Sequence, residues 1–186
     1  MKSNGTSCSI PDRSVLKKDS KLFDYSDSYQ RSFSDIEGTI DSTKIGLLFF
    51  SGKSKVTDIL FAIRNKVVGL FGLKTSGQMS DSQKLPDHFK CEPGEQRGLF
   101  RVFDKTENEV VLGEDDKHLN FRVSLFLDRI PDDTGKKSLT ITTTVKFNNL
   151  LGRVYFMIVR PFHKLIVPAM LKGMIKRIEN EKSTKR

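Results

Sequence analysis

The sequence has little of what most metal sites and covalent active sites are built from. It contains no tryptophan, two cysteines and three histidines in 186 residues. Cys8 and Cys91 are too few for a disulfide framework or a cysteine metal site. Asp115, Asp116 and His118 form a small cluster of acidic and histidine residues, and aspartates at this point are typical of a turn between strands. No nucleophile elbow occurs, so the sequence indicates no cofactor and favours a protein that is not an enzyme.

The N-terminal residues MKSNGTSCSIPDRS also lack the continuous apolar segment found in secretory signals. The default location is therefore the reducing cytoplasm. Residues 154–171 are long enough to cross a bilayer, but Arg160, His163 and Lys164 fall inside them and two prolines interrupt them. We expect this segment to lie in a folded domain, with a membrane span as the less favoured alternative.

The net charge of +9 is concentrated at the C-terminal end, where residues 151–186 contain nine Lys or Arg and two Glu, a net charge of +7. Such an end fits a peripheral contact with an anionic membrane, for which Lys172, Lys176 and Arg177 are the candidate residues. The alternative is a solvated helix end whose cations complement the helix dipole, and we favour it. We expect no nucleic-acid partner.

Size and composition fit one domain with one substantial core, since 37% of the residues are hydrophobic. We expect a flexible leader over residues 1–27, a single domain over 28–181 and a basic tail over 182–186. The 14 phenylalanines suit either a packed core, the favoured interpretation, or an apolar cavity.

Four segments precede the strand-rich part of the chain. Residues 28–34 alternate aromatic and polar side chains and predict a first strand. Residues 35–52 predict a short helix, although their phenylalanines would also suit a strand. Residues 54–72 carry apolar positions at steps of three and four and predict an amphipathic helix. Residues 74–97 are polar and broken by Gly and Pro, which predicts a long connection with a short strand at 88–91.

From Gly98 onward the period of the apolar residues changes to two, which is typical of antiparallel strands. Residues 99–103 and 109–112 predict a hairpin, followed by strands at 118–128 and 138–147. One face of these last two strands holds Leu119, Phe121, Val123, Leu125, Leu127, Leu139, Ile141, Thr143, Val145 and Phe147. The threonine-rich opposite face of the last strand suits the wet side of a sheet.

A helix over residues 152–181 follows, capped by Asn148 or Asn149. Its first half is apolar around most of its circumference and should be largely buried. Pro161 and Pro168 within it predict a kink or a break.

Two polar residues of this helix, Arg160 and His163, need partners, because an unsatisfied buried polar group costs roughly 1–3 kcal/mol. The partner is either internal, such as Asp115, Asp116 or backbone freed by Pro161, or a bound ligand.

Several motifs together are similar to a bacterial family known only as a domain of unknown function, which itself resembles the START and Bet v 1-like, or SRPBCC, superfamily. The resemblance covers about residues 25–178. The motifs are Arg64-Asn65, Phe71-Gly72-Leu73-Lys74, the run Val111 to Arg122, Gly152-Arg153, Tyr155 and Pro161-Phe162-His163. The resemblance implies an α+β helix-grip fold, in which a curved antiparallel sheet surrounds a long C-terminal helix with an apolar cavity between them.

Members of that superfamily bind lipids, sterols or polyketides, and some are cyclases or hydrolases. The leading hypothesis is therefore binding of a hydrophobic small molecule or lipid between the sheet and the last helix. The candidate ligand-binding residues are Phe121, Val123, Leu125, Ile141, Val145, Tyr155, Ile158, Phe162 and His163. Two alternatives remain: a cyclase- or hydrolase-like enzyme using His163, Tyr155 or Arg122, and a membrane-surface or protein-interaction module using the basic C-terminus.

Overall fold

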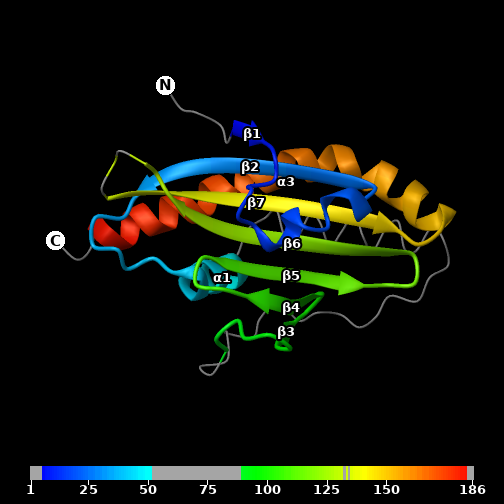
Figure 1. The fold of residues 1–186 in the computed structure, drawn as a ribbon, viewed down its shortest axis with the longest axis horizontal. Coiled ribbons are helices and arrows are strands. Elements are labelled where there is room, and N and C mark those ends of the chain that lie inside the picture. The colour runs from blue at the N-terminus through cyan, green and yellow to red at the C-terminus, as the bar shows by residue number, and fades with distance from the viewer. Residues whose placement is uncertain (1–5, 52–88, 132, 134, 184–186) are drawn as a thin grey trace.

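The computed structural model describes residues 6–51, 89–131, 133 and 135–183 (Figure 1). These residues form one antiparallel sheet in the order β1-β2-β7-β6-β5-β4-β3. The strands are β1 (Thr6–Cys8), β2 (Tyr25–Ser34), β3 (Gln96–Arg97), β4 (Phe100–Lys105), β5 (Glu109–Asp115), β6 (Leu119–Arg129) and β7 (Lys136–Phe147). The α-helices are α1 (Ser42–Ser51) and α3 (Leu150–Ser183), and two 3-10 helices, Val15–Lys17 and Ser20–Leu22, precede β2.

The two longest strands, β6 and β7, confirm the predicted alternation. Val123 lies opposite Thr143, and Leu125 lies opposite Ile141. Because directly opposite residues point to the same face of an antiparallel pair, the apolar residues of both strands form one surface. Figure 1 shows α1 and α3 together behind this sheet, and the apolar surface packs against both helices. The fold is therefore the α+β, helix-grip-like arrangement predicted from the sequence.

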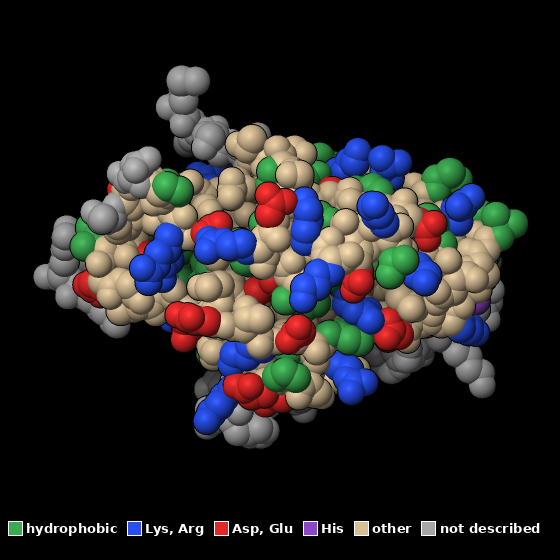
Figure 2. Space-filling model, viewed as in Figure 1, with side chains coloured by type: hydrophobic (Ala, Val, Ile, Leu, Met, Phe, Trp, Pro, Cys, Tyr) green, Lys and Arg blue, Asp and Glu red, His purple; other side chains and the backbone are tan. Residues whose placement is uncertain are grey.

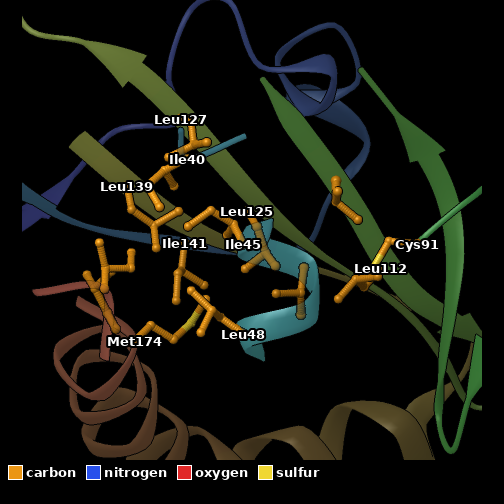
Figure 3. Packing of buried hydrophobic residues seen from close by; sticks show 14 of the residues in the cluster. Ile40, Ile45, Leu48, Cys91, Leu112, Leu125, Leu127, Leu139, Ile141 and Met174 are labelled. Carbon is orange, nitrogen blue, oxygen red and sulfur yellow. The ribbon is translucent and has the colours of Figure 1, made fainter. Parts of the chain in front are cut away.

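The main core lies between the sheet, α1 and the second half of α3 (Figure 3). Ile45 and Leu48 of α1 and Met174 of α3 pack in one cluster with Leu125 and Ile141 of the sheet. All five side chains are buried. Burying one such side chain contributes roughly 1.5–3 kcal/mol. This packing holds the C-terminal half of α3 against the sheet.

The helix α1 approaches the segment before β3 very closely. A Cβ atom placed on Gly46 would lie 2.5 Å from the sulfur of Cys91. Cys91 is fully buried, and burial raises the pKa of its thiol to about 11. The Cys91 sulfur therefore occupies the space that Gly46 leaves by having no side chain. Cys91 contributes to the packing between α1 and this segment.

The helix α3 starts at Leu150, two residues before the predicted start, and Asn149 is the cap of the two predicted candidates, because its side-chain oxygen accepts a hydrogen bond from the backbone N–H of Gly152 at 3.0 Å. A Cβ atom on Gly152 would lie 2.7 Å from the carbonyl carbon of His118, so glycine is needed where the helix crosses the β5–β6 turn. The helix is continuous through Pro161 and Pro168, and the predicted break is absent.

Residues 9–24 lie on the face of the sheet opposite the helices, as the blue segment in front of the strands in Figure 1 shows. Glu109 of β5, 1% exposed, holds this segment in place. Its carboxylate accepts hydrogen bonds from the Ser14 hydroxyl at 2.6 Å, from the Val15 N–H at 2.8 Å and from the Ser124 hydroxyl. The sequence predicts a flexible leader here, but the structure packs residues 9–24 against the sheet.

The threonine-rich face of β7, predicted to be wet, is buried instead. Thr140, Thr142 and Thr144 are all fully buried. Thr142 shares a hydrogen bond of 2.9 Å with Ser28 on β2. The hydroxyls of Thr140 and Thr144, like that of Thr143, have no hydrogen-bond partner among the described residues. The prediction failed because a row of β-branched polar residues does not distinguish a covered face of a sheet from a solvent-exposed one.

The remaining predicted elements have mixed outcomes. The first strand begins at Tyr25 rather than residue 28, and the 35–52 segment is helical over α1. The hairpin predicted at 99–112 is β4 and β5. Residues 89–91 are not in a strand, and the helix predicted over 54–72 lies outside the described residues.

Candidate functional site

The structure brings most of the predicted binding residues to the face of the sheet that α3 covers. The sheet contributes Phe121, Val123, Leu125, Ile141 and Val145 to this face, and Tyr155 and His163 of α3 lie against it. Apart from His163, these residues belong to two hydrophobic clusters, a large one under the second half of α3 and a smaller one under its first half. The smaller cluster is built around Leu119, Val145 and Phe156.

Two predicted residues, Ile158 and Phe162, do not join this face. They are 37% and 42% exposed, whereas Phe156, His163 and Val167 on the same helix are buried. Residues four apart share one side of a helix, so Ile158 and Phe162 lie together on the side of α3 that is turned away from the sheet. The first half of α3 is apolar around most of its circumference, and such a sequence contains little signal for which side meets the strands.

A polar group lies between the two hydrophobic clusters, where α3 crosses β2. The imidazole Nε2 of His163 donates a hydrogen bond to Oδ1 of Asp27 at 3.1 Å. The hydroxyl of Tyr25 donates to Oδ2 of the same carboxylate at 2.7 Å. The guanidinium of Arg160 lies 5.0 Å from the centre of the Tyr25 ring. These four side chains, the Asp27 cluster, tie the first half of α3 to the edge of β2.

Two tyrosines near this carboxylate are held in their neutral form. Burial, followed by the hydrogen bond to Asp27, raises the pKa of the Tyr25 phenol well above its usual value. Burial and the Asp27 charge raise the pKa of Tyr29 as well. At neutral pH both phenols therefore keep their protons and remain available as hydrogen-bond donors.

Thr143 of β7 lies directly opposite Asp27 in the sheet, on the same face. It is 4% exposed, and its hydroxyl has no hydrogen-bond partner among the described residues. Most buried polar side chains in native proteins are hydrogen-bonded, so a buried hydroxyl without a partner needs an explanation. A ligand hydroxyl or a water molecule at this point would supply the missing partner.

Half-buried aromatic rings continue the same face toward α1. The ring centres of Phe121 and Phe100 are 5.8 Å apart, and those of Phe100 and Phe49 are 5.1 Å apart. Both pairs make edge-to-face contacts. Phe50 contacts Phe49 and Phe100 in the same way. The face thus presents polar groups at the β2 edge and aromatic surface toward the β4 edge, a distribution that suits a ligand with one polar end.

Sequence reasoning missed Asp27, Thr143 and the two tyrosines of β2. The boundary predicted at residue 28 left Tyr25 and Asp27 outside the domain. Thr143 did carry a signal, because it is the single polar residue in the otherwise apolar alternation of its strand. A polar residue in a buried row of a strand marks either a structural hydrogen bond or a site.

His163 has an internal partner, as the sequence favoured, but that partner is Asp27 and not Asp115 or Asp116. Asp115 pairs with Arg122 at 2.8 Å, and Asp116 accepts a hydrogen bond from the backbone of His118 in the β5–β6 turn. Arg122 also stacks 3.5 Å from the centre of the Phe103 ring. Since Arg122 alternates with Phe121 along β6, it belongs to the face away from α3 and takes no part in the site.

Searches of curated proteins and of solved structures found no match to the chain. A family model described as "Protein of unknown function (DUF2867)" matches residues 20–170. The matched range begins before Tyr25 and ends after Val167, so it includes β2 with Asp27, Thr143 and the first half of α3. The chain therefore belongs to the DUF2867 family of proteins of unknown function.

Proposed function

We propose that this protein binds a hydrophobic small molecule or lipid with an uncharged hydroxyl end, between the sheet and the first half of α3. The observation that carries the proposal is the unpartnered, buried hydroxyl of Thr143 beside the Asp27 cluster. The polar end of the ligand would bond there, and its apolar body would lie along Val123 and Phe121. This function agrees with the resemblance to START and Bet v 1-like proteins, which we propose as the wider superfamily, and with a cytoplasmic location.

The charge of the site favours a hydroxyl over a carboxylate. A ligand carboxylate would lie beside the Asp27 carboxylate, and like charges at such separations repel by several kcal/mol when desolvated. A hydroxyl can donate to Asp27 and accept from Thr143 without adding charge. Long-chain alcohols and sterols therefore fit the site better than fatty acids.

Two ligands of equal chain length, 1-hexadecanol and palmitic acid, test this preference. Native mass spectrometry and thermal shifts of the full chain should detect hexadecanol binding at concentrations where palmitate does not bind. Thr143→Val should weaken hexadecanol binding about three- to tenfold, the effect of one hydrogen bond of roughly 0.5–1.5 kcal/mol. Equal binding of the two ligands, or binding by neither, would contradict the proposal.

A second candidate function, hydrolysis, is favoured by one specific observation, the hydrogen bond between His163 and Asp27. A carboxylate that fixes the orientation of an imidazole is a common arrangement for a general base. A long-chain nitrophenyl ester tests it: turnover by the wild type should disappear in His163→Ala and persist in His118→Ala. A wild-type rate equal to that of buffer alone would exclude hydrolysis of this ester class.

A further inference from the structure

The side of α3 turned away from the sheet carries a row of exposed apolar residues in the first half of the helix. We call this row the apolar stripe; it consists of Leu150, Met157, Ile158, Phe162 and Leu165. Three of its members, Leu150, Met157 and Leu165, are 75%, 67% and 73% exposed. With about 3.6 residues per turn, the stripe lies opposite the buried face of the helix. Scattered exposed apolar residues are ordinary, but a row along one helix side marks a contact surface.

The charges that α3 itself contributes around the apolar stripe are all of one sign. Residues 150–178 contain six Lys or Arg and no Asp or Glu. Arg153 and Lys164 are exposed along one flank of the stripe, beside Arg160, whose guanidinium belongs to the Asp27 cluster. Lys172 and Lys176 are exposed beyond the C-terminal end of the stripe. Figure 2, which views the molecule from the sheet side, shows hydrophobic and basic side chains, with acidic ones nearby, at the upper right where α3 projects past the strands, and mixed acidic and basic side chains over the sheet.

We propose that the apolar stripe and its basic flank dock the protein on an anionic phospholipid bilayer, with the first half of α3 lying in the membrane interface. Apolar side chains would enter the boundary between headgroups and acyl chains, and the long basic side chains would reach the lipid phosphates. Each cation near such a surface strengthens binding about fivefold. The stripe supplies the apolar component that a purely basic patch lacks.

A transmembrane position fits the helix less well. By length and composition α3 would suffice to cross a bilayer, but core helices of folded domains also satisfy these criteria, and 33% of its most apolar window is buried against the rest of the protein. Crossing would break the bond from His163 to Asp27 and carry Arg160 and Lys164 into hydrocarbon. An orientation along the surface leaves the fold intact.

The charge distribution also argues against a second copy of the chain or a nucleic acid as the partner. A symmetric dimer through the apolar stripe would place the basic flanks of both copies close together, with no acidic residue in 150–178 to compensate them. A nucleic acid would meet the basic flank but leave Met157 and Leu165 exposed to water. A bilayer with anionic headgroups matches both the apolar and the charged component.

The residues differ in part from those predicted from the sequence. Lys172 and Lys176 are exposed and adjoin the apolar stripe. Arg177 instead turns toward α1, where its guanidinium donates hydrogen bonds to the carbonyl of Leu48 at 3.1 Å and to the Ser51 hydroxyl at 3.3 Å. Arg177 therefore joins two helices and is not part of the docking surface.

Sedimentation of the full chain with vesicles tests the proposal. We expect binding to vesicles of phosphatidylglycerol and phosphatidylcholine in equal parts, weaker binding at high salt, and little binding to phosphatidylcholine alone. Leu165→Glu should weaken binding at least tenfold, because it removes a leucine from the buried contact and adds a charge. Leu22→Glu is the matched control, since Leu22 is 61% exposed but lies in the 3-10 helix Ser20–Leu22, outside the stripe.

Equal binding of Leu165→Glu and Leu22→Glu to the anionic vesicles would overturn the proposal, as would the absence of binding by the wild type. Retention of the wild type in membranes after alkaline carbonate washing would overturn it in favour of a spanning helix. A dimer that Leu165→Glu converts to monomer in sedimentation equilibrium would overturn it in favour of a second copy. Hexadecanol binding should be the same in Leu165→Glu and wild type, so this test is separate from that of the proposed ligand.

Discussion

Replacing Thr143 by valine is expected to stabilise the free protein while it weakens ligand binding. The two side chains have nearly the same shape, so the substitution removes a hydroxyl without leaving a cavity. In the free protein Thr143 is 4% exposed, and its hydroxyl has no hydrogen-bond partner among the described residues. Its burial therefore costs free energy that a valine methyl group would not cost.

The size of this change follows from the free-energy cost of burying an unsatisfied hydroxyl, about 1–3 kcal/mol. Local adjustment of the free protein reduces part of this cost. We expect Thr143→Val to raise the free energy of unfolding by about 1–2 kcal/mol. For a chain of this length, that corresponds to a rise of roughly 2–8 °C in Tm. Few substitutions at a buried position stabilise a protein, so the sign alone is informative.

Thr142→Val provides the matched control on the adjacent position of the same strand. Thr142 is also fully buried, but its hydroxyl shares the 2.9 Å hydrogen bond with Ser28. The substitution leaves the Ser28 hydroxyl buried without that partner, so we expect the free energy of unfolding to fall by about 1–2 kcal/mol. Urea denaturation of both variants and the wild type measures the two changes under one set of conditions.

The reasoning would be refuted if Thr143→Val lowered the free energy of unfolding as much as Thr142→Val does. That result would mean that the Thr143 hydroxyl already has a hydrogen-bond partner in the free protein. The site would then contain no unpartnered polar group for a ligand to bind. Stabilisation together with unchanged hexadecanol affinity would keep the structural reasoning and exclude Thr143 from ligand binding.

Three further substitutions or conditions test other parts of the structure. Gly152→Ala should lower the free energy of unfolding by at least about 2 kcal/mol, because the added Cβ would overlap the β5–β6 turn. Gly173→Ala, which has open space around its Cβ position, should leave stability unchanged or raise it. Thermal denaturation measures both changes. Glu109→Gln should weaken attachment of residues 9–24 and accelerate their cleavage by trypsin, while the exposed Glu107→Gln should not. Stability should fall as pH rises above 10, where the unfolded chain loses the Tyr25 proton that the folded protein retains, and Tyr25→Phe should reduce this fall in pH-dependent denaturation.

The sequence by itself determined the long strands, α1 and α3, and the apolar face of the sheet. Alternation over β6 and β7 predicted which residues form the surface under the helices, since a strand turns each successive side chain to the opposite side. Asn149 at the start of α3 was predicted because a cap depends on residues only a few positions away. These features are local, and local spacing is enough to encode them.

Only the tertiary structure decided how these elements meet. Asp27 and His163 are 136 positions apart, and no short-range pattern links them until β2 and α3 pack together. The side of α3 that meets the sheet was equally undetermined, because its first half is apolar around most of its circumference. Pairing of β2 with β7 places Asp27 opposite Thr143, and the hydrogen bond from His163 to Asp27 turns one side of α3 to the sheet, which leaves Ile158 and Phe162 on the outer side.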